Sequence, residues 1–255
     1  MSRFLERRSK MKRLFLLVVI FSVGCSPNGI LAPTSVPVAV TPPPRQIAVA
    51  GTRVYVALGD SITQGTGGSV NMDFVSLLQD FLNYWYPTTT ALNFGTSGIS
   101  AEAFASAMPY VLSNIPITPD FVTIELGIND LIKKDTEEVG GTYLMPYSSA
   151  VTNSYIFKAA LTTIITSMRG MPGAHAKITL ANVYKTHFAD DWTDGVNVFN
   201  EYNKRVSEVA VEQGVGLVDL ATVFAANPSL YISPDGIHPS DSGHYAISVE
   251  EEKCF

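Results

Sequence analysis

Short apolar runs that alternate with helical patterns constrain the fold of this chain more than any other feature of its sequence. Runs rich in Val, Ile, Leu and Phe are typical of strands buried on both faces of a parallel sheet. Helical spacing of apolar residues separates these runs, which predicts an α/β domain with helices on both faces of the sheet. The strand-like runs are residues 54–58, 90–94, 121–126, 177–183 and 216–220. The clearest helical patterns are Asp73–Trp85, Ser154–Met168 and Val198–Gln213.

A Gly-Asp-Ser sequence, Gly59 to Ser61, ends the first apolar run. A residue at this point lies at the carboxyl edge of the predicted sheet, where open α/β folds place their sites. A helix that starts nearby favours negative charge developing on the serine hydroxyl. The alternative interpretation is an ordinary Asp or Ser cap on a strand-to-helix turn.

Three later motifs supply what a serine nucleophile needs, and each follows a predicted strand. A serine hydroxyl is a weak nucleophile at neutral pH unless a base takes its proton as it attacks. His238 can act as that base, and Asp235 can bind the other ring nitrogen and stabilise the imidazolium. Asp219, at the end of the last predicted strand, is the rival acid. The three motifs are Asn93–Gly98, Gly127–Asp130 and Asp235–Pro239.

The attack of a serine on an ester creates an oxyanion, which needs hydrogen-bond donors held in place. The candidates are the backbone N–H groups of Ser61 and Gly98 and the side-chain amide of Asn129. Gly98 allows a close approach of the backbone because it carries no side chain. Asp60 and Asp130 flank these candidates, and we expect them to brace their loops by accepting backbone N–H groups.

The four motifs, in this order and spacing, resemble those of the SGNH (GDSL) hydrolase superfamily, over roughly residues 53 to 247. The resemblance implies a three-layer α/β/α sandwich with a five-stranded parallel sheet, of flavodoxin-like type. It also implies hydrolysis of esters or thioesters. Carried over by motif, the catalytic residues are Ser61, Asp235 and His238, and the oxyanion donors are Ser61, Gly98 and Asn129.

The start of the chain has the pattern of an export signal. A basic opening precedes an eleven-residue apolar stretch, Leu14–Gly24, which is too short for a comfortable membrane span. Ser22–Cys25 resembles a bacterial lipoprotein cleavage box, so we expect a membrane tether through a lipidated Cys25. Plain secretion and an uncleaved anchor are the alternatives. The predicted organisation is a signal peptide over 1–24, a proline-rich tether over 25–50 and a catalytic domain over 51–255.

Charge and cysteine content exclude several classes of function. The chain carries 17 basic and 23 acidic residues, for a net charge of −6, and it becomes more acidic once residues 1–24 are removed. An acidic domain repels phosphate backbones, so we expect no nucleic-acid partner. Cys25 and Cys254 are the only cysteines, which excludes a disulfide framework and a Cys-based metal site. A bridge between these two is the alternative if Cys25 stays unmodified.

Other sequence features have weaker functional interpretations. Gly65–Gly68 follows a strand but lacks the Lys-Ser/Thr of a phosphate-binding loop. His187 with Asp190 and Asp191 is an alternative metal-ligand set. His244 is better interpreted as a packing or capping residue than as a second base. The chain stops about ten residues after His244, so the final helix is expected to be short.

Two long loops, Lys133–Ser149 and Tyr184–Gly195, are expected to wall the site with apolar and aromatic side chains. The alternative is that their aromatic side chains cover an edge of the core. We therefore expect an exported serine hydrolase that cleaves carboxylic esters of short to medium acyl chains through an acyl-enzyme, without metal or cofactor. A carbohydrate O-deacetylase is the alternative within enzymes, and a non-catalytic surface-binding module is the alternative outside them.

Overall fold

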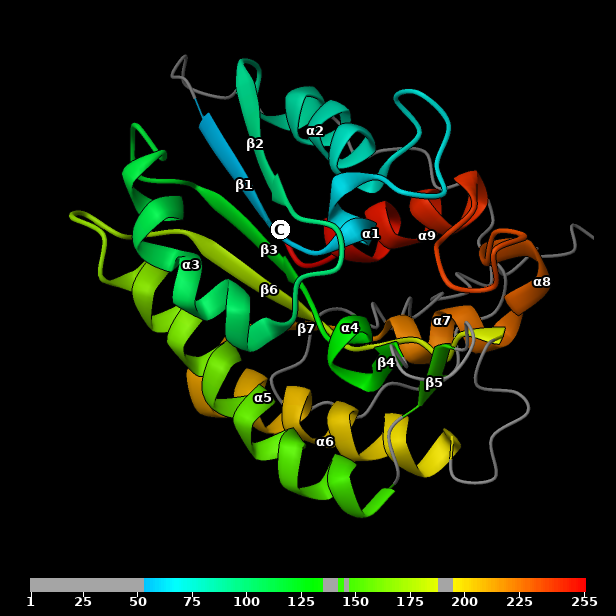
Figure 1. The fold of residues 1–255 in the computed structure, drawn as a ribbon. Helices are drawn as coiled ribbons and strands as arrows, with labels where there is room; N and C mark the ends of the chain where they lie inside the picture. The colour runs from blue at the N-terminus through cyan, green and yellow to red at the C-terminus, as the bar shows by residue number, and fades with distance from the viewer. Residues whose placement is uncertain (1–52, 135–141, 145–146, 188–194) are drawn as a thin grey trace, which may run out of the picture.

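The computed structural model describes residues 53–134, 142–144, 147–187 and 195–255 (Figure 1). The predicted signal peptide, the tether and Cys25 lie outside these residues, so their boundaries stay predictions. Among the described ranges, no helix has both the length and the apolar character needed to cross a membrane.

Five parallel strands form the central sheet, in the order β2-β1-β3-β6-β7. The chain pairs β2 on one side of β1 and then returns to pair β3 on the other, so the winding direction reverses at β1. In doubly wound folds this reversal is the place where ligands bind. The strands are β1 (Arg53–Gly59), β2 (Thr89–Gly95), β3 (Phe121–Glu125), β6 (Lys177–Ala181) and β7 (Gly216–Val218).

Helices cover both faces of this sheet, as Figure 1 shows. Helices α2 (Phe74–Trp85) and α9 (Asp241–Glu252) pack together on one face. On the other face α5 (Tyr147–Arg169) contacts both α3 (Ala101–Ser113) and α6 (Gly195–Gln213). The predicted three-layer α/β/α sandwich with a five-stranded parallel sheet is therefore confirmed. The short helices are α1 (Ser61–Gln64), α4 (Ile128–Leu131), α7 (Leu220–Ala226) and α8 (Pro228–Tyr231).

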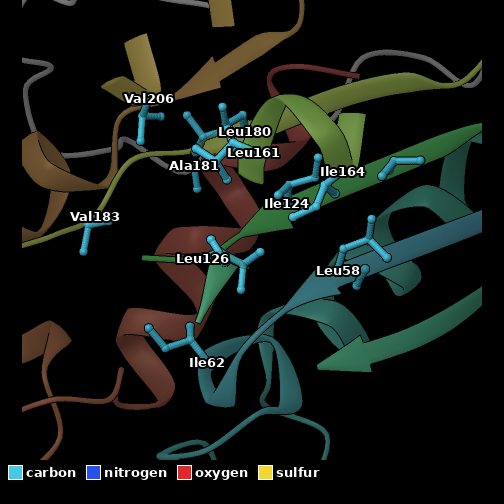
Figure 2. Packing of buried hydrophobic residues seen from close by; sticks show 14 of the residues in the cluster. Leu58, Ile62, Ile124, Leu126, Leu161, Ile164, Leu180, Ala181, Val183 and Val206 are labelled. Atoms are coloured by element: carbon cyan, nitrogen blue, oxygen red, sulfur yellow. The ribbon is translucent and has the colours of Figure 1, made fainter. Parts of the chain in front are cut away.

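The core lies between the sheet and the two helical layers. Residues Val54 to Leu58 of β1 are all buried, as expected for a central strand covered on both faces. In Figure 2, Leu58 belongs to the same buried cluster as Ile124 of β3 and Ile164 of α5. This packing holds the carboxyl ends of β1 and β3 in a fixed relative position.

Two predicted strands are two residues shorter in the structure, and side chains explain where they end. The run over 216–220 ends as a strand at Val218 because Asp219 caps α7. The run over 177–183 ends at Ala181. Beyond it, the Asn203 side chain of α6 accepts the Val183 N–H and donates to the Val183 carbonyl, each at 2.8 Å.

One loop prediction was wrong in part. The segment Lys133–Ser149 was predicted as a long loop, but it contains most of the antiparallel hairpin of β4 (Ile132–Lys134) and β5 (Thr142–Leu144) and the start of α5. Helix α3 is not among the clearest predicted helices, because Pro109 in its interior is a residue that usually breaks a helix. The final helix, α9, has 12 residues and begins at the N-cap Ser240.

A buried carboxyl group links α9 to the sheet. Thr179 of β6 donates its hydroxyl to Glu251 Oε2 at 2.5 Å, and both residues are buried. Among the described residues, Glu251 Oε1 has no hydrogen-bond partner. Burial raises the pKa of Glu251 from 4.5 to about 8, because the apolar surroundings disfavour the charged form.

We predict that Glu251→Gln makes stability less sensitive to alkaline pH. The folded state prefers protonated Glu251. The stability that this group contributes is therefore fully present below its pKa in the unfolded chain, and it is lost as the pH rises through its pKa in the folded protein, about 8. Between about pH 5 and about pH 9, the free energy of unfolding of the variant should rise, relative to the parent, by on the order of a few kcal/mol. Urea unfolding at both pH values measures this, and a pH-independent difference would contradict the account.

Candidate active site

Ser61 lies where the central strand ends. Strand β1 stops at Gly59, and the Asp60 side chain then caps α1 by accepting the Ile62 N–H at 2.9 Å. Ser61 is the first residue of α1 and is only 4% exposed. The predicted strand–serine–helix arrangement is thus present, and the cap interpretation also holds, with Asp60 as the capping residue.

His238 reaches Ser61 from the loop between α8 and α9. Its Nε2 lies 2.9 Å from Ser61 Oγ, although the two residues are 177 positions apart in the chain. Its Nδ1 lies 2.6 Å from Asp235 Oδ2. An ionised carboxylate only accepts hydrogen bonds, so Nδ1 carries the proton, and Nε2 accepts from the serine hydroxyl. The three side chains therefore form one continuous hydrogen-bonded chain.

Asp235 is held as an ionised acceptor. Its Oδ1 accepts the backbone N–H groups of Ile237 and His238, both at 2.9 Å, and the Ser233 hydroxyl at 2.8 Å. Partial burial opposes ionisation, but these bonds and the His238 ring lower the pKa of Asp235 to about 2. The carboxylate thus stays charged throughout the range in which histidine works as a base.

Three contacts fix the loop that carries His238. The Tyr184 hydroxyl donates to the Ile237 carbonyl at 2.7 Å, and the Ser233 N–H donates to the His238 carbonyl at 2.8 Å. Gly67 has φ of +93° and packs so closely that a Cβ there would lie 2.2 Å from the Pro239 carbonyl oxygen. Sequence reasoning missed Tyr184, whose partner is 53 residues away in the chain, and Ser233, whose nearby partners are set by the loop conformation.

The candidate oxyanion donors follow three adjacent strands. Ser61 follows β1, Gly98 follows β2, and Asn129 lies in α4 after β3. Gly98 has φ of +78°, and a Cβ at this position would meet no atom within 4 Å, so its backbone is approachable. The Asn129 amide nitrogen donates to Asp60 Oδ2 at 3.2 Å.

The two flanking aspartates behave as predicted braces. Asp60 accepts the Ile62 N–H, and Asp130 accepts the Ala101 N–H at 3.0 and 3.3 Å. The second interaction ties α4, which carries Asn129, to the first residue of α3.

The rival acid, Asp219, has different partners. It caps α7 by accepting the Thr222 N–H at 3.2 Å, and it also accepts the Thr222 hydroxyl at 2.6 Å and the Asn182 amide at 2.7 Å. His238 is bonded to Asp235 instead.

His244 is a buried structural residue. Its Nε2 lies 3.1 Å from the Thr66 carbonyl, so this nitrogen donates, and its Nδ1 accepts the Phe74 N–H at 3.3 Å. Burial lowers its pKa, which favours the neutral form that both bonds require. The packing interpretation of His244 is therefore confirmed.

The glycine-rich segment Gly65–Gly68 supports the histidine loop, through Gly67 against Pro239. Just after it, Ser69 donates its N–H and hydroxyl to Asp241 at the start of α9, at 2.6 and 2.9 Å. In the part of the chain that the structure describes, no three His, Cys, Asp or Glu residues gather closely enough to hold a metal. Asp190 and Asp191, the suggested partners of His187, lie outside that part.

The fold and this hydrogen-bonded chain define a serine hydrolase of the α/β/α class. Residues 57–246 match the sequence model of the GDSL-like lipase/acylhydrolase family, and the chain belongs to that family. It is therefore a GDSL-type ester hydrolase.

Known proteins with a similar sequence or fold include lipases and an esterase. The spore germination lipase LipC of Bacillus licheniformis is 24% identical over 208 residues, which cover 76% of this chain and 92% of LipC. A lipase from a goat rumen metagenome superposes with a TM-score of 0.63 at 19% identity, over 80% of this chain and 97% of that one. An acetyl xylan esterase superposes with a TM-score of 0.57 at 20% identity, over 78% of this chain and 96% of that one.

The two candidate acids give a matched pair of variants. We predict that Asp235→Asn lowers kcat by roughly 10²-fold or more, because an amide facing Nδ1 favours the wrong tautomer of His238. Asp219→Ala should keep kcat close to that of the parent and cost about 1 kcal/mol of stability through the lost helix cap. Ester hydrolysis and thermal unfolding of both variants test this. The reverse pattern of activities would make Asp219 the acid.

Proposed function

We propose that this hydrolase cleaves carboxylic esters of short to medium acyl chains through an acyl-enzyme on Ser61. The observation that carries the proposal is the continuous hydrogen-bonded chain from Asp235 through His238 to Ser61. It supplies a nucleophile, a base in the correct tautomer and an ionised partner for that base.

In the first half-reaction Ser61 Oγ attacks the ester carbonyl carbon and His238 Nε2 takes the hydroxyl proton. Asp235 stabilises the resulting imidazolium, and the oxyanion accepts hydrogen bonds from the Ser61 and Gly98 N–H groups and the Asn129 amide. The intermediate then collapses, and His238 returns the proton to the leaving alcohol.

The second half-reaction repeats these steps with water. His238 takes a proton from a water molecule, which attacks the acyl carbon and forms a second tetrahedral intermediate. Its collapse releases the carboxylic acid and restores the Ser61 hydroxyl with the proton held on His238. Both half-reactions use the same donors and the same base, so loss of one group slows both.

A carbohydrate O-deacetylase is the second candidate. It is kept because an acetyl xylan esterase shares the fold, and because the same catalytic groups serve an acetylated sugar equally well. The two candidates differ in how activity depends on acyl length, since a deacetylase accepts acetate and rejects longer chains.

A panel of p-nitrophenyl esters from acetate to palmitate, run beside acetylated xylan, tests the proposal. Each added methylene gains at most about 0.8 kcal/mol while it stays buried, so kcat/KM should rise over the first few carbons and then fall. We expect the optimum between acetate and octanoate. Hydrolysis confined to acetate favours the deacetylase, and a maximum at palmitate would contradict both. Ser61→Ala is the control and should be inactive throughout.

We also propose that the chain is exported and tethered to a membrane through Cys25. The basic opening, the apolar run Leu14–Gly24, the Gly24-Cys25 junction and the proline-rich segment support this proposal. Two acyl chains anchor stably where one is marginal, so Cys25→Ala should release soluble protein or block processing. Fractionation of cells expressing both forms measures this, and equal membrane association of parent and variant would favour an uncleaved helix.

A further inference from the structure

Two buried carboxyl groups lie together at the strand ends next to the nucleophile. Asp60 at the start of α1 is 0% exposed, and Glu125, the last residue of β3, is 3% exposed. Their side chains form a hydrogen bond. Two carboxyl groups make such a bond only when at least one of them carries a proton, because ionised carboxylates only accept. The pair therefore holds at least one proton in its bonded state.

The other contacts of the pair show which group holds that proton. Both oxygens of Asp60 accept: Oδ1 takes the Ile62 N–H at 2.9 Å and Oδ2 takes the Asn129 amide at 3.2 Å. Glu125 receives only a long contact, 3.5 Å, from the Thr63 hydroxyl. Asp60 is thus the better hydrogen-bonded anion and Glu125 the donor. Burial raises the pKa of Asp60 itself to about 7, so the pair holds a single proton above that pH. Burial, followed by the adjacent Asp60 charge, raises the pKa of Glu125 well above its ordinary value.

We propose that protonated Glu125 and ionised Asp60 act as a positioning pair that orients the Asn129 amide and the Ser61 backbone toward the oxyanion. The inference rests on the proposed function, since it assumes that Asn129 is an oxyanion donor. An asparagine amide can rotate so that its oxygen and nitrogen exchange places. Asp60 Oδ2 accepts one hydrogen of the NH₂ group, so the nitrogen stays on the side of the nucleophile and its second hydrogen remains for the substrate. Asp60 also directly precedes Ser61 and caps its helix, which fixes the peptide that donates the second hydrogen bond.

The surroundings of the pair make a second negative charge costly. Asp130 on α4 acts on Asp60, and Glu251 on α9 acts on Glu125, and each raises the pKa of the group it faces. Tyr184, which follows β6, also faces both carboxyl groups. These neighbours are all acidic, so loss of the Glu125 proton at high pH leaves two adjacent carboxylates that repel each other. The Asp60 side chain then moves, and the orientation of Asn129 is lost with it.

A double-mutant cycle tests whether Asp60 acts through Asn129. Asn129→Ala should lower kcat by roughly 10²–10³-fold, the usual loss for one oxyanion donor. Asp60→Asn places an NH₂ group against the Asn129 amide and should lower kcat by roughly tenfold or more, with KM little changed. In the Asn129→Ala background the same change should cost less than about threefold, because the group it orients is gone. Independent, multiplying losses would overturn the inference, as would full activity of Asp60→Asn. An unchanged kcat for Asn129→Ala would instead remove the oxyanion role of Asn129 under the proposed function, and the inference with it.

The pH profile of Glu125→Gln tests the shared proton. The parent should lose kcat at alkaline pH as Glu125 ionises, whereas glutamine keeps a donor for Asp60 and has no such proton to lose. We expect the alkaline decline to disappear from the Glu125→Gln profile. Glu251→Gln is the control, because this buried carboxyl contacts Thr179. It should keep the decline but move it to lower pH, since the Glu251 charge helps to raise the pKa of Glu125. A decline that persists in Glu125→Gln, or that vanishes in Glu251→Gln, would contradict the proposal. Circular dichroism at each pH confirms that the variants remain folded.

Discussion

Backbone hydrogen bonds join β1 to β2 on one side and to β3 on the other, with Gly59 opposite both Gly95 and Glu125. This register brings the carboxyl ends of three parallel strands to one place. Each strand leads directly into a segment that carries a candidate oxyanion donor. Because the strands are buried and their register is set by the sheet, the positions of Ser61, Gly98 and Asn129 follow from strand pairing more than from loop conformation.

The position of the base, His238, is not set by strand pairing. His238 comes from a loop near the end of the chain, so its position depends on contacts that cross the molecule. Tyr184 holds the loop from the end of β6, and Gly67 holds it from the segment after α1. His244 adds a third connection, since it joins α9 to the Thr66 carbonyl and to the start of α2. The sheet therefore sets one half of the site, and side-chain contacts between elements set the other.

The sequence predicted the parts of the site that lie in short motifs at strand ends. The strand-then-polar pattern located Ser61 and Asn129, and the Asp235-to-His238 spacing predicted a local pair that the structure contains. Tyr184 was not predicted because its partner, the Ile237 carbonyl, is distant in the chain. Ser233 was not predicted because its bond to Asp235, two residues away, depends on the conformation of the loop. A role for Glu125 was not predicted either, because it is a single polar residue at the end of an apolar strand.

The same limit explains the errors in the fold. At Val218 the strand ends because the Asp219 side chain caps α7, and after Ala181 the Asn203 side chain bonds both backbone groups of Val183. Pro109 disguised α3, and the apolar run around Tyr143 forms a hairpin strand within a predicted loop. Local propensity thus identified the five strands of the central sheet and three of the helices that cover it, and side-chain capping set several of their boundaries.

The most direct test of the account is to identify the residue that a serine-directed fluorophosphonate modifies. The protein is treated with the reagent, and the adduct is mapped by peptide mass spectrometry. The account predicts one adduct per chain, located on Ser61, and a strongly reduced rate of labelling when His238 is replaced by alanine, because the base no longer takes the serine proton. An adduct on a different residue, or labelling that is independent of His238, would contradict it.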